Sequence, residues 1–395
     1  MTEVADLQKG AKISNLNDPK VRAVFSQVAV VAILLFLVVA IIQNASSNLS
    51  RMNQDFGFAF LSKSAGFDIF QVLFPYSSAS SYGTALIVGL FNTILISVLS
   101  IVAATVLGLL IGIMRLSRNW LASRFAVAYI EFFRNVPLLL QIFVWYTAVI
   151  IQMLPAPREA WSLFGLSYLS NRGLVVPHPS FGSGSWMGIA GIVAAITAIW
   201  SLRRWVAIRQ ARTGEPFPVA IVSVVVLILL PMVGFAIAGF PVNWDVPAKT
   251  TFSFSGGMVI SPELMALFLA LSIYMATYIA EAVRAGIQAV SHGQIEAAQA
   301  LGLRGGATLR LIVLPQALRV IIPPLASIYL GTTKSSSLAV AIGYPDLVAV
   351  GGTVLNQTGK AIEIVVIWMA VYLALSLFTS LLMNWFNARM KLVER

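Results

Sequence analysis

The segment from Ser291 to Arg319, SHGQIEAAQALGLRGGATLRLIVLPQALR, lies between two long apolar runs and holds the strongest indication of the fold. Residues 294–301 are good helix formers, and Gly302 is the residue type that most often ends a helix in the left-handed conformation. The pattern predicts a short helix followed by a turn. A helix this short can lie across a surface, and it connects segments of a very different composition.

The rest of the chain is unusually apolar. Of 395 residues, 58% are hydrophobic and only 10% are charged, whereas soluble domains carry about 25% charged residues. Several apolar runs are about 20 residues long, which is the length that crosses a bilayer as a helix. The runs show no alternation of apolar and polar residues, so helices are expected rather than a β-barrel.

Eight apolar runs are long enough to be transmembrane helices, which predicts an all-α polytopic membrane protein. Basic residues gather in the short loops, most strongly at Arg203, Arg204, Arg209 and Arg212, and such loops mark the cytoplasmic side. Eight helices place every basic loop on that side, with both termini cytoplasmic, whereas seven or nine would place one outside. The predicted runs are 24–42, 84–114, 125–154, 186–202, 218–240, 262–282, 311–342 and 362–386.

The same residues exclude several classes of function. The net charge of +11 follows the loops, so it indicates membrane topology and not nucleic-acid binding. The absence of cysteine excludes disulfides and cysteine nucleophiles. His178 and His292 are predicted to be surface residues, and no metal site or catalytic constellation is expected. Residues 331–335, GTTKS, have Thr333 where a phosphate-binding loop needs glycine. Any ATPase must therefore be a separate chain.

The opening segment resembles the coupling loop of ABC-importer permeases, E-A-A-x3-G-x9-I-x-L-P, and all seven specified positions match. In that family the loop transmits closure of the ATPase dimer to the membrane helices. Small alanines would allow close approach of the partner, the glutamate would supply a charge, and the glycine would let the chain turn back. The residues assigned to ATPase coupling are Glu296, Ala297, Ala298, Gly302, Ile312, Leu314 and Pro315. The alternative is that this segment is an ordinary amphipathic connecting loop without a coupling role.

Three further stretches resemble HisM/HisQ-type permeases for polar amino acids. Residues 131–141, EFFRNVPLLLQ, are similar to E-x-F-R-G-T-P-L-L-x-Q, with Asn135 and Val136 in place of the usual Gly and Thr. Residues 277–287, TYIAEAVRAGI, are similar to A-Y-x-A-E-x-x-R-G-G-I, and residues 334–338, KSSSL, are a weaker match to K-x-T-S-L. The enlarged layout resembles the AapQ/BztB branch of broad-range L-amino-acid permeases.

The resemblance divides the chain into a five-helix type I ABC importer core and additions to it. The core comprises helices two and three (83–154) and helices six to eight (261–390), with a cytoplasmic coupling loop at 283–315. The additions are a cytoplasmic N-terminus with an extra first helix (1–43), a periplasmic segment (44–82), and an insert with two helices (155–260) whose role is open.

The resemblance implies a permease that moves L-amino acids from periplasm to cytoplasm by alternating access across a bacterial inner membrane. The implied partners are a second permease subunit, identical or similar, an ATPase dimer, a periplasmic amino acid binding protein and membrane lipid. ATP and Mg would be bound by the ATPase, so the chain needs no cofactor of its own. The alternative is an ion-gradient-driven secondary transporter or channel for small polar solutes, which gains no support from an internal repeat.

Charged residues inside the predicted helices are functional candidates because lipid exposure of a charge is costly. Glu131 and Arg134 either neutralise each other or serve the pathway. Glu281 and Arg284 repeat this spacing, and a structural or docking role is expected for them. Lys334, in a predicted proline-broken helix, either attracts a substrate carboxylate or is structural, capping carbonyls or pairing with Asp346. The candidates for the translocation path are Arg134, Asn135, Thr333, Lys334, Ser335, Ser336 and Ser337.

Overall fold

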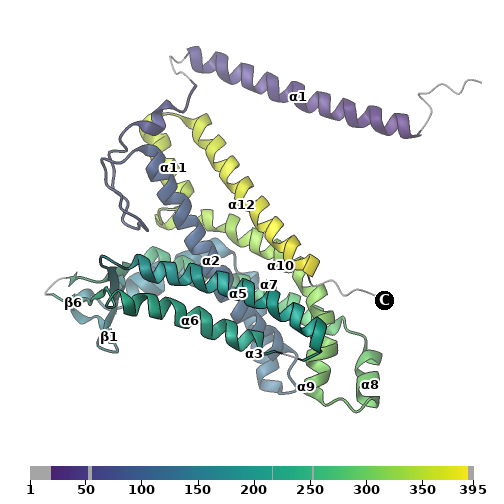
Figure 1. Ribbon diagram of the computed structural model, residues 1–395. Helices are drawn as coiled ribbons and strands as arrows, with labels where there is room; N and C mark the ends of the chain where they lie inside the picture. Colours follow the sequence, from purple (N-terminus) through teal and green to yellow (C-terminus); the bar gives the residue numbers. More distant parts are fainter. Residues whose placement is uncertain (1–18, 52–55, 216, 251–252, 390–395) are drawn as a thin grey trace, which may run out of the picture.

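The computed structural model describes residues 19–51, 56–215, 217–250 and 253–389, and these are mostly helical (Figure 1). The long helices are α1 (Pro19–Arg51), α2 (Tyr82–Arg115), α3 (Trp120–Asn135), α5 (Trp186–Thr213), α6 (Val219–Ile237), α7 (Pro262–Gln288), α10 (Leu314–Ser335), α11 (Leu347–Thr358) and α12 (Ala361–Arg389). The short helices are η2 (Ala59–Ser62), α4 (Leu138–Phe143), η3 (Val144–Met153), η4 (Pro157–Glu159), α8 (His292–Ala300), α9 (Gly305–Thr308), η5 (Leu309–Val313) and η6 (Ser336–Ile342).

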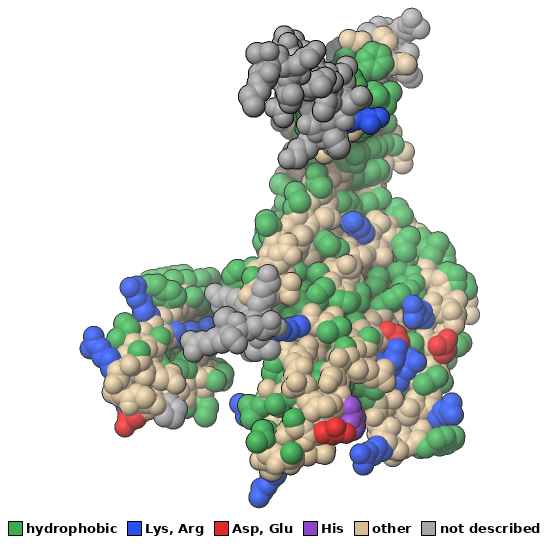
Figure 2. Space-filling view, turned by 90° about the vertical axis from the view of Figure 1, so that its right-hand side faces the viewer, with side chains coloured by type: hydrophobic (Ala, Val, Ile, Leu, Met, Phe, Trp, Pro, Cys, Tyr) green, Lys and Arg blue, Asp and Glu red, His purple; other side chains and the backbone are tan. Residues whose placement is uncertain are grey.

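Within the described residues, six helices are long and apolar enough to cross a membrane, and a bent pair formed by α3 with α4–η3 makes seven. The polytopic helical fold is therefore as predicted. The eighth expected span, residues 24–42, falls within α1, whose apolar stretch Val24–Leu37 is shorter than the others. Figure 2 shows apolar side chains over much of one face, with most of the charged side chains in its lower half.

The core is built around α7, which is the most deeply buried of the candidate spans. Its N-terminus is set by Ser261, whose hydroxyl accepts from the Leu264 amide at 3.2 Å, followed by proline in the first turn. The helices α2 and α10 pack along it, and α3, α4 and η3 also contact it. The helix reaches Gln288, so the predicted loop 283–315 begins later than expected.

Glycines let α2 approach α7 closely. A Cβ added at Gly108 would lie 2.6 Å from the Cβ of Ile279, and one added at Gly112 would lie 2.9 Å from the carbonyl oxygen of Ala280. No side chain fits at such distances, so the backbone of α2 packs directly against the backbone and side chains of α7, as small residues allow in membrane proteins.

The predicted continuous helix at 125–154 is wrong, because α3 and α4–η3 meet at an angle of 101°. Val136 precedes a proline, which disfavours helical geometry, and its backbone is extended (φ −93°, ψ 126°). The buried side chain of Gln141 repairs the break, because its Nε2 donates to the carbonyl oxygens of Phe133 at 2.7 Å and Val136 at 2.9 Å. The bend is therefore a stabilised feature of the fold.

The prediction that prolines break the helix before Lys334 is also wrong, because α10 continues through Pro323 and Pro324 to Ser335. Packing on α7 and α12 supports this helix on two sides. A 3₁₀ segment, η6, then leads to Gly343 (φ +78°) and to α11, a helix that sequence reasoning missed. Asp346 caps the N-terminus of α11 and is fully buried, with 0% of its surface exposed.

The prediction that the fold is purely helical misses small sheets in the insert. Its strands are β1 (Trp161–Leu163), β2 (Ser167–Ser170), β3 (Gly173–Val176), β4 (His178–Phe181), β5 (Val242–Asp245), β6 (Ala248–Lys249), β7 (Phe254–Ser255) and β8 (Met258–Ile260). They form antiparallel sheets in the orders β1-β2-β3-β8, β4-β5 and β6-β7. The pairs β3–β8 and β4–β5 join the segments before α5 and after α6, so these segments lie on one side.

The insert itself is a hairpin of α5 and α6, which pack tightly along each other (Figure 1). A Cβ at Gly191 would lie 2.6 Å from the Leu230 carbonyl oxygen, and one at Gly234 would lie 2.3 Å from that of Met187. The helix α5 extends to Thr213, well beyond the predicted end at residue 202, and Gly214 (φ +71°) ends it. The basic residues of this region therefore lie on the last turns of a helix rather than in a loop.

Candidate functional site

The expected short helix is present as α8, which projects from the core between the ends of α7 and α9 (Figure 1). Glu296 and Ala297 are exposed on it, and Glu296 Oε1 lies 2.9 Å from Nδ1 of His292, one turn earlier. Ala298 is only 1% exposed and faces inward. The two alanines therefore differ: Ala297 is available to a partner, and Ala298 anchors the helix to its own chain.

A hollow of about 250 Å³ lies behind α8. Its walls come from α8 and from the chain that returns to the membrane, and they include Ile295, Gln299, Leu303, Thr308 and Val313. The packing of Ile295 and Val313 with the main core holds α8 against the end of the helical bundle. The outward face of α8 is left uncovered by the described residues.

The turn after α8 depends on Gly302, whose φ is +72°. Its amide donates to the carbonyl oxygen of Gln299 at 2.9 Å, and the Leu303 amide donates to that of Ala298 at 3.0 Å. Left-handed geometry is costly for other residues, which explains glycine here. Leu301, just before the turn, is 80% exposed and extends the uncovered apolar surface.

The remaining motif positions lie on the way back to the core. Ile312 belongs to η5 and is half-buried, and Leu314 is exposed at the start of α10. Pro315 is the second residue of α10, and this helix directly follows η5, whose wider turns come just before the residue that lacks an amide proton. These residues therefore form one continuous unit with α8, although only Glu296 and Ala297 of the seven are on its outer face.

Arg134 does not form the expected ion pair with Glu131. Its guanidinium lies over the ring of Tyr278 in α7, 5.2 Å from the ring centroid, and the Tyr278 hydroxyl is 2.9 Å from that of Tyr274. Asn135 instead approaches Glu131, donating from Nδ2 to its backbone oxygen at 2.8 Å and its Oε2 at 3.3 Å. The tyrosines were not singled out from the sequence, although Tyr278 lies inside the motif at 277–287.

Lys334 is exposed in the last turn of α10, and the predicted pair with Asp346 is not formed, because Asp346 is buried at the cap of α11. The neighbouring hydroxyls are engaged with their own helix. Thr333 Oγ1 donates to the Tyr329 carbonyl oxygen at 3.1 Å, Ser336 Oγ to that of Thr333 at 2.8 Å, and Ser337 Oγ to that of Lys334 at 2.8 Å. Thr333 and Ser336 are buried, so of these three hydroxyl groups only that of Ser337 is open to accept a hydrogen bond from a ligand. Ser335, the remaining candidate, is half-buried.

Glu281 and Arg284 form the structural pair that their spacing predicts, at 3.0 Å. A third residue, Arg115 at the end of α2, makes an ion pair with the same carboxylate. Arg115 was not among the candidate residues from the sequence, and nothing in the pattern pointed to its partner across the fold.

Residues 104–392 match the protein family described as "Binding-protein-dependent transport system inner membrane component". The chain belongs to this family. It is 52% identical over 383 residues to the "General L-amino acid transport system permease protein AapQ" of Rhizobium johnstonii, a match that covers 97% of this chain and 95% of that one. Two further relatives are "Putative amino-acid ABC transporter permease protein YhdX" of Escherichia coli, 50% identical with 96% of each chain covered, and BztB, a "Glutamate/glutamine/aspartate/asparagine transport system permease protein" of Rhodobacter capsulatus, 40% identical with 96% of each covered.

A binding-protein-dependent inner membrane component is the multi-pass permease subunit of an ABC importer, and it catalyses no covalent chemistry. Membership of the family implies an ATPase and a binding protein as partners. The resemblance inferred from residues 296–315 is thereby confirmed at the level of the family, and the ion-gradient alternative gains no support.

Proposed function

We propose that this permease takes up a broad range of L-amino acids, and that α8 is the element through which a separate ATPase dimer drives the transport. A second permease subunit of the same type completes the path, and a periplasmic binding protein delivers the substrate. Both termini are cytoplasmic. ATP and Mg act in the ATPase chains alone. The names of the relatives, which include a general L-amino acid permease, support the substrate class.

The placement of α8 supports its role most directly. Its inner side is fixed by Ala298, and its outer side presents Glu296, Ala297 and Leu301 with no cover from the described chain. A helix that is anchored on one side and open on the other can be pushed by a partner and pass the displacement to α7 and α10. Glu296 supplies a charge for a specific polar contact, and Ala297 allows the partner to come close.

Substitution of Gly302 tests this role. Gly302→Pro requires a negative φ and removes the amide that bonds to Gln299, so the end of α8 must rearrange. We expect the variant to reach the membrane and bind the loaded binding protein, while uptake per ATP hydrolysed falls at least about tenfold, the effect of a mid-range coupling free energy.

Gly302→Asn is the matched control, because asparagine tolerates the left-handed conformation and keeps the amide. It should transport at close to the wild-type rate. Uptake by purified transporter in liposomes is measured together with ATP hydrolysis. Normal uptake by Gly302→Pro would contradict the coupling role.

The translocation path is proposed to include Arg134, Asn135 and the hydroxyl-rich stretch from Thr333 to Ser337, where α10 passes into η6, with Lys334. All L-amino acids share a carboxylate, which a guanidinium or ammonium group attracts regardless of the side chain. The guanidinium of Arg134 lies over the ring of Tyr278, next to the bend after α3, where the backbone is already irregular. Irregular backbone at membrane depth is tolerated where it lines a cavity.

Arg134→Ala and Lys334→Ala should each lower the rate of uptake several-fold for amino acids of every side-chain class, because the shared carboxylate loses a partner. Arg124→Ala, which removes an exposed arginine from the start of the same helix as Arg134, serves as the control. The readout is uptake of labelled glutamate, glutamine and leucine by equal amounts of assembled transporter. Wild-type rates in both variants would overturn the assignment of the path.

A further inference from the structure

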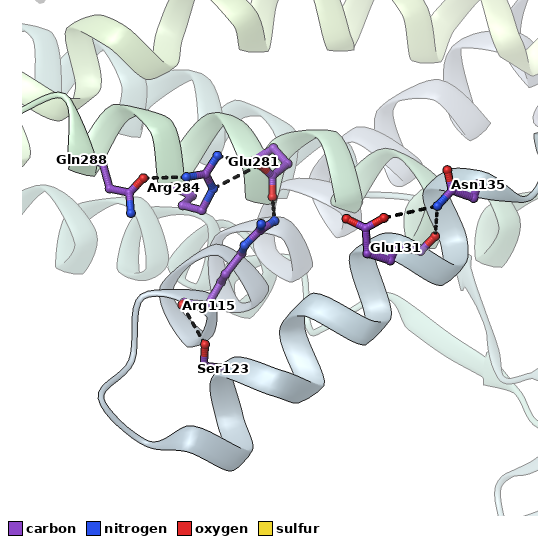
Figure 3. A network of polar contacts seen from close by, with 7 residues as sticks. All are labelled: Arg115, Ser123, Glu131, Asn135, Glu281, Arg284 and Gln288. Atoms are coloured by element: carbon purple, nitrogen blue, oxygen red, sulfur yellow. Dashed lines mark hydrogen bonds and ion pairs between the residues drawn. The ribbon is translucent and has the colours of Figure 1, made fainter.

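Glu281 is placed between two arginines from different helices (Figure 3). Its Oε2 accepts from Nε of Arg284 at 3.1 Å and from Nη2 of Arg284 at 3.0 Å, both within α7. Its Oε1, which is shielded from solvent, makes the ion pair with Nη1 of Arg115 in α2. Arg284 is itself held by Gln288, whose Oε1 accepts from Nη1.

These residues occupy the cytoplasmic ends of α2 and α7. The glycines that bring the two helices together, Gly108 and Gly112, precede Arg115 by two turns and one turn. The side chains of Ile279 and Val283 in α7 fill the notches at these glycines. The ion pair adds a polar restraint between the two helices at the end of this apolar contact.

The position of the pair relative to α8 gives it a role in transport. Only residues 289–291 separate the end of α7 from the start of α8. A force on α8 therefore reaches α7 directly, and the contact between α7 and α2 is the most extensive route by which it reaches α2. The carboxylate is partly buried, with a side-chain exposure of 20%, so the ion pair is less screened than one on an open surface.

We propose that Arg115, Glu281 and Arg284 form a clamp through which displacement of α8 moves α2 and α7 as one body. Glu281 is the positioning residue, Arg284 orients its carboxylate, and Arg115 carries the contact to α2. The inference rests on the proposed role of α8 in coupling. Without the carboxylate, Arg115 and Arg284 repel each other, and the helix ends separate under load.

Three variants test the clamp in the assembled transporter, reconstituted in liposomes with its ATPase and binding protein. Glu281→Gln and Arg115→Gln should each lower uptake per ATP by at least about fivefold, and the double variant should be no worse than Glu281→Gln alone, since both remove the same contact. Arg118→Gln is the matched control, because Arg118 is an exposed arginine in the short loop that follows α2. Unchanged uptake per ATP in Glu281→Gln would overturn the clamp.

Conservative substitutions distinguish a specific loss of the clamp from a general loss of stability. The Arg115 side chain makes one ion pair within the described residues, through Nη1, so Arg115→Lys should keep most of the coupling. Arg284 binds through three nitrogens, and lysine cannot reproduce this fork, so Arg284→Lys should lose more of it. Equal losses in the two lysine variants would contradict the proposed division of roles.

A distance measurement tests the movement itself, and it remains informative if a clamp variant fails to fold. The chain has no cysteine, so spin labels can be placed at Ser117→Cys, beyond α2, and Ala289→Cys, beyond α7. In the wild-type background we expect the distance to stay constant between the nucleotide-free and vanadate-trapped transporter, and in Glu281→Gln to change on trapping. A change of several ångströms in the wild type would overturn the proposal.

The two proposals fail in distinguishable ways. If α8 does not couple to an ATPase, Gly302→Pro keeps a normal ratio of uptake to ATP hydrolysis, whereas it loses this ratio if α8 does couple. If only the clamp is wrong, wild-type uptake is normal, and Glu281→Gln matches it.

Discussion

Asp346 is the residue at which burial and charge conflict most directly. It is fully enclosed, outside the candidate spans, and its Oδ1 accepts from the Ala349 amide at 2.8 Å at the start of α11. Its Oδ2 has no hydrogen-bond partner within the described protein. Burial raises the pKa of this carboxyl to about 7, against the lowering effect of the backbone amides of α11.

The stability of the fold should depend on this carboxyl. Because the folded-state pKa of about 7 lies above the ordinary value of 3.8, the folded state retains a proton that the unfolded state releases between these values. The contribution of Asp346 to stability is therefore highest below about pH 4, falls as the pH rises toward 7, and is constant above it. Asp346→Asn keeps the capping oxygen and cannot ionise, so its gain in Tm over the wild type should be larger at about pH 8 than at about pH 5. Thermal unfolding in detergent measures this, and an equal Tm difference at both pH values would contradict it.

Arg134 shows what a sequence leaves open at the scale of a residue. The spacing of Glu131 and Arg134 correctly placed them on neighbouring turns of one helix. It could not reveal that the ring of Tyr278, 144 positions further along, offers the guanidinium a better surface. The motif positions 296–315 were easier, because their roles are set by local properties such as the left-handed backbone at Gly302.

At the scale of the helix, prolines acted differently at two places. Pro137 ends α3, because the residue before it adopts extended geometry and the chain then turns by 101°. Pro323 and Pro324 leave α10 intact, because the surrounding helices hold it straight enough to continue. The local chemistry is the same in both cases. Whether a proline ends the helix is determined by packing against helices that are distant in sequence. The short strands and α11 were missed because they too depend on such distant contacts.

The contact between α2 and α7 should be sensitive to a single methyl group. At Gly112 a Cβ would stand 2.9 Å from both the Ala280 carbonyl oxygen and the Val283 Cβ. Gly112→Ala must push the helices apart, at a cost of about 1–3 kcal/mol. Gly331→Ala in α10 is the control, because nothing lies within 4 Å of its added Cβ and alanine favours the helix by about 0.5–1 kcal/mol.

Thermal unfolding of the two glycine variants should therefore shift in opposite directions, downward for Gly112→Ala and upward or not at all for Gly331→Ala. If Gly112→Ala were as stable as the control, the backbone contact between the helices would be looser than the structure indicates.

At the scale of the whole molecule, the sheets show which segments of the insert share one end of the bundle. Strand β3 pairs with β8, and β4 with β5, across the entire α5–α6 hairpin. Both segments must then lie at the same end of the bundle, and α8 lies away from them at another end (Figure 1). Seven crossings from Tyr82 onward start at the end that carries the strands and finish at the opposite one. If α1 is an eighth crossing, both termini share the side of α8.

Single cysteines can test this parity, because the chain contains none of its own. Phe164, at the tip of the β1–β2 hairpin, is 99% exposed, and Leu301, at the end of α8, is 80% exposed. A membrane-impermeant thiol reagent added to intact spheroplasts should label Phe164→Cys at once and Leu301→Cys only after the membrane is opened. A cysteine at Thr2, before α1, should behave like Leu301→Cys if α1 spans the membrane. Labelling of Thr2→Cys from outside would leave seven crossings and place the N-terminus in the periplasm, whereas labelling of Leu301→Cys from outside would reverse the whole topology and remove α8 from the reach of an ATPase.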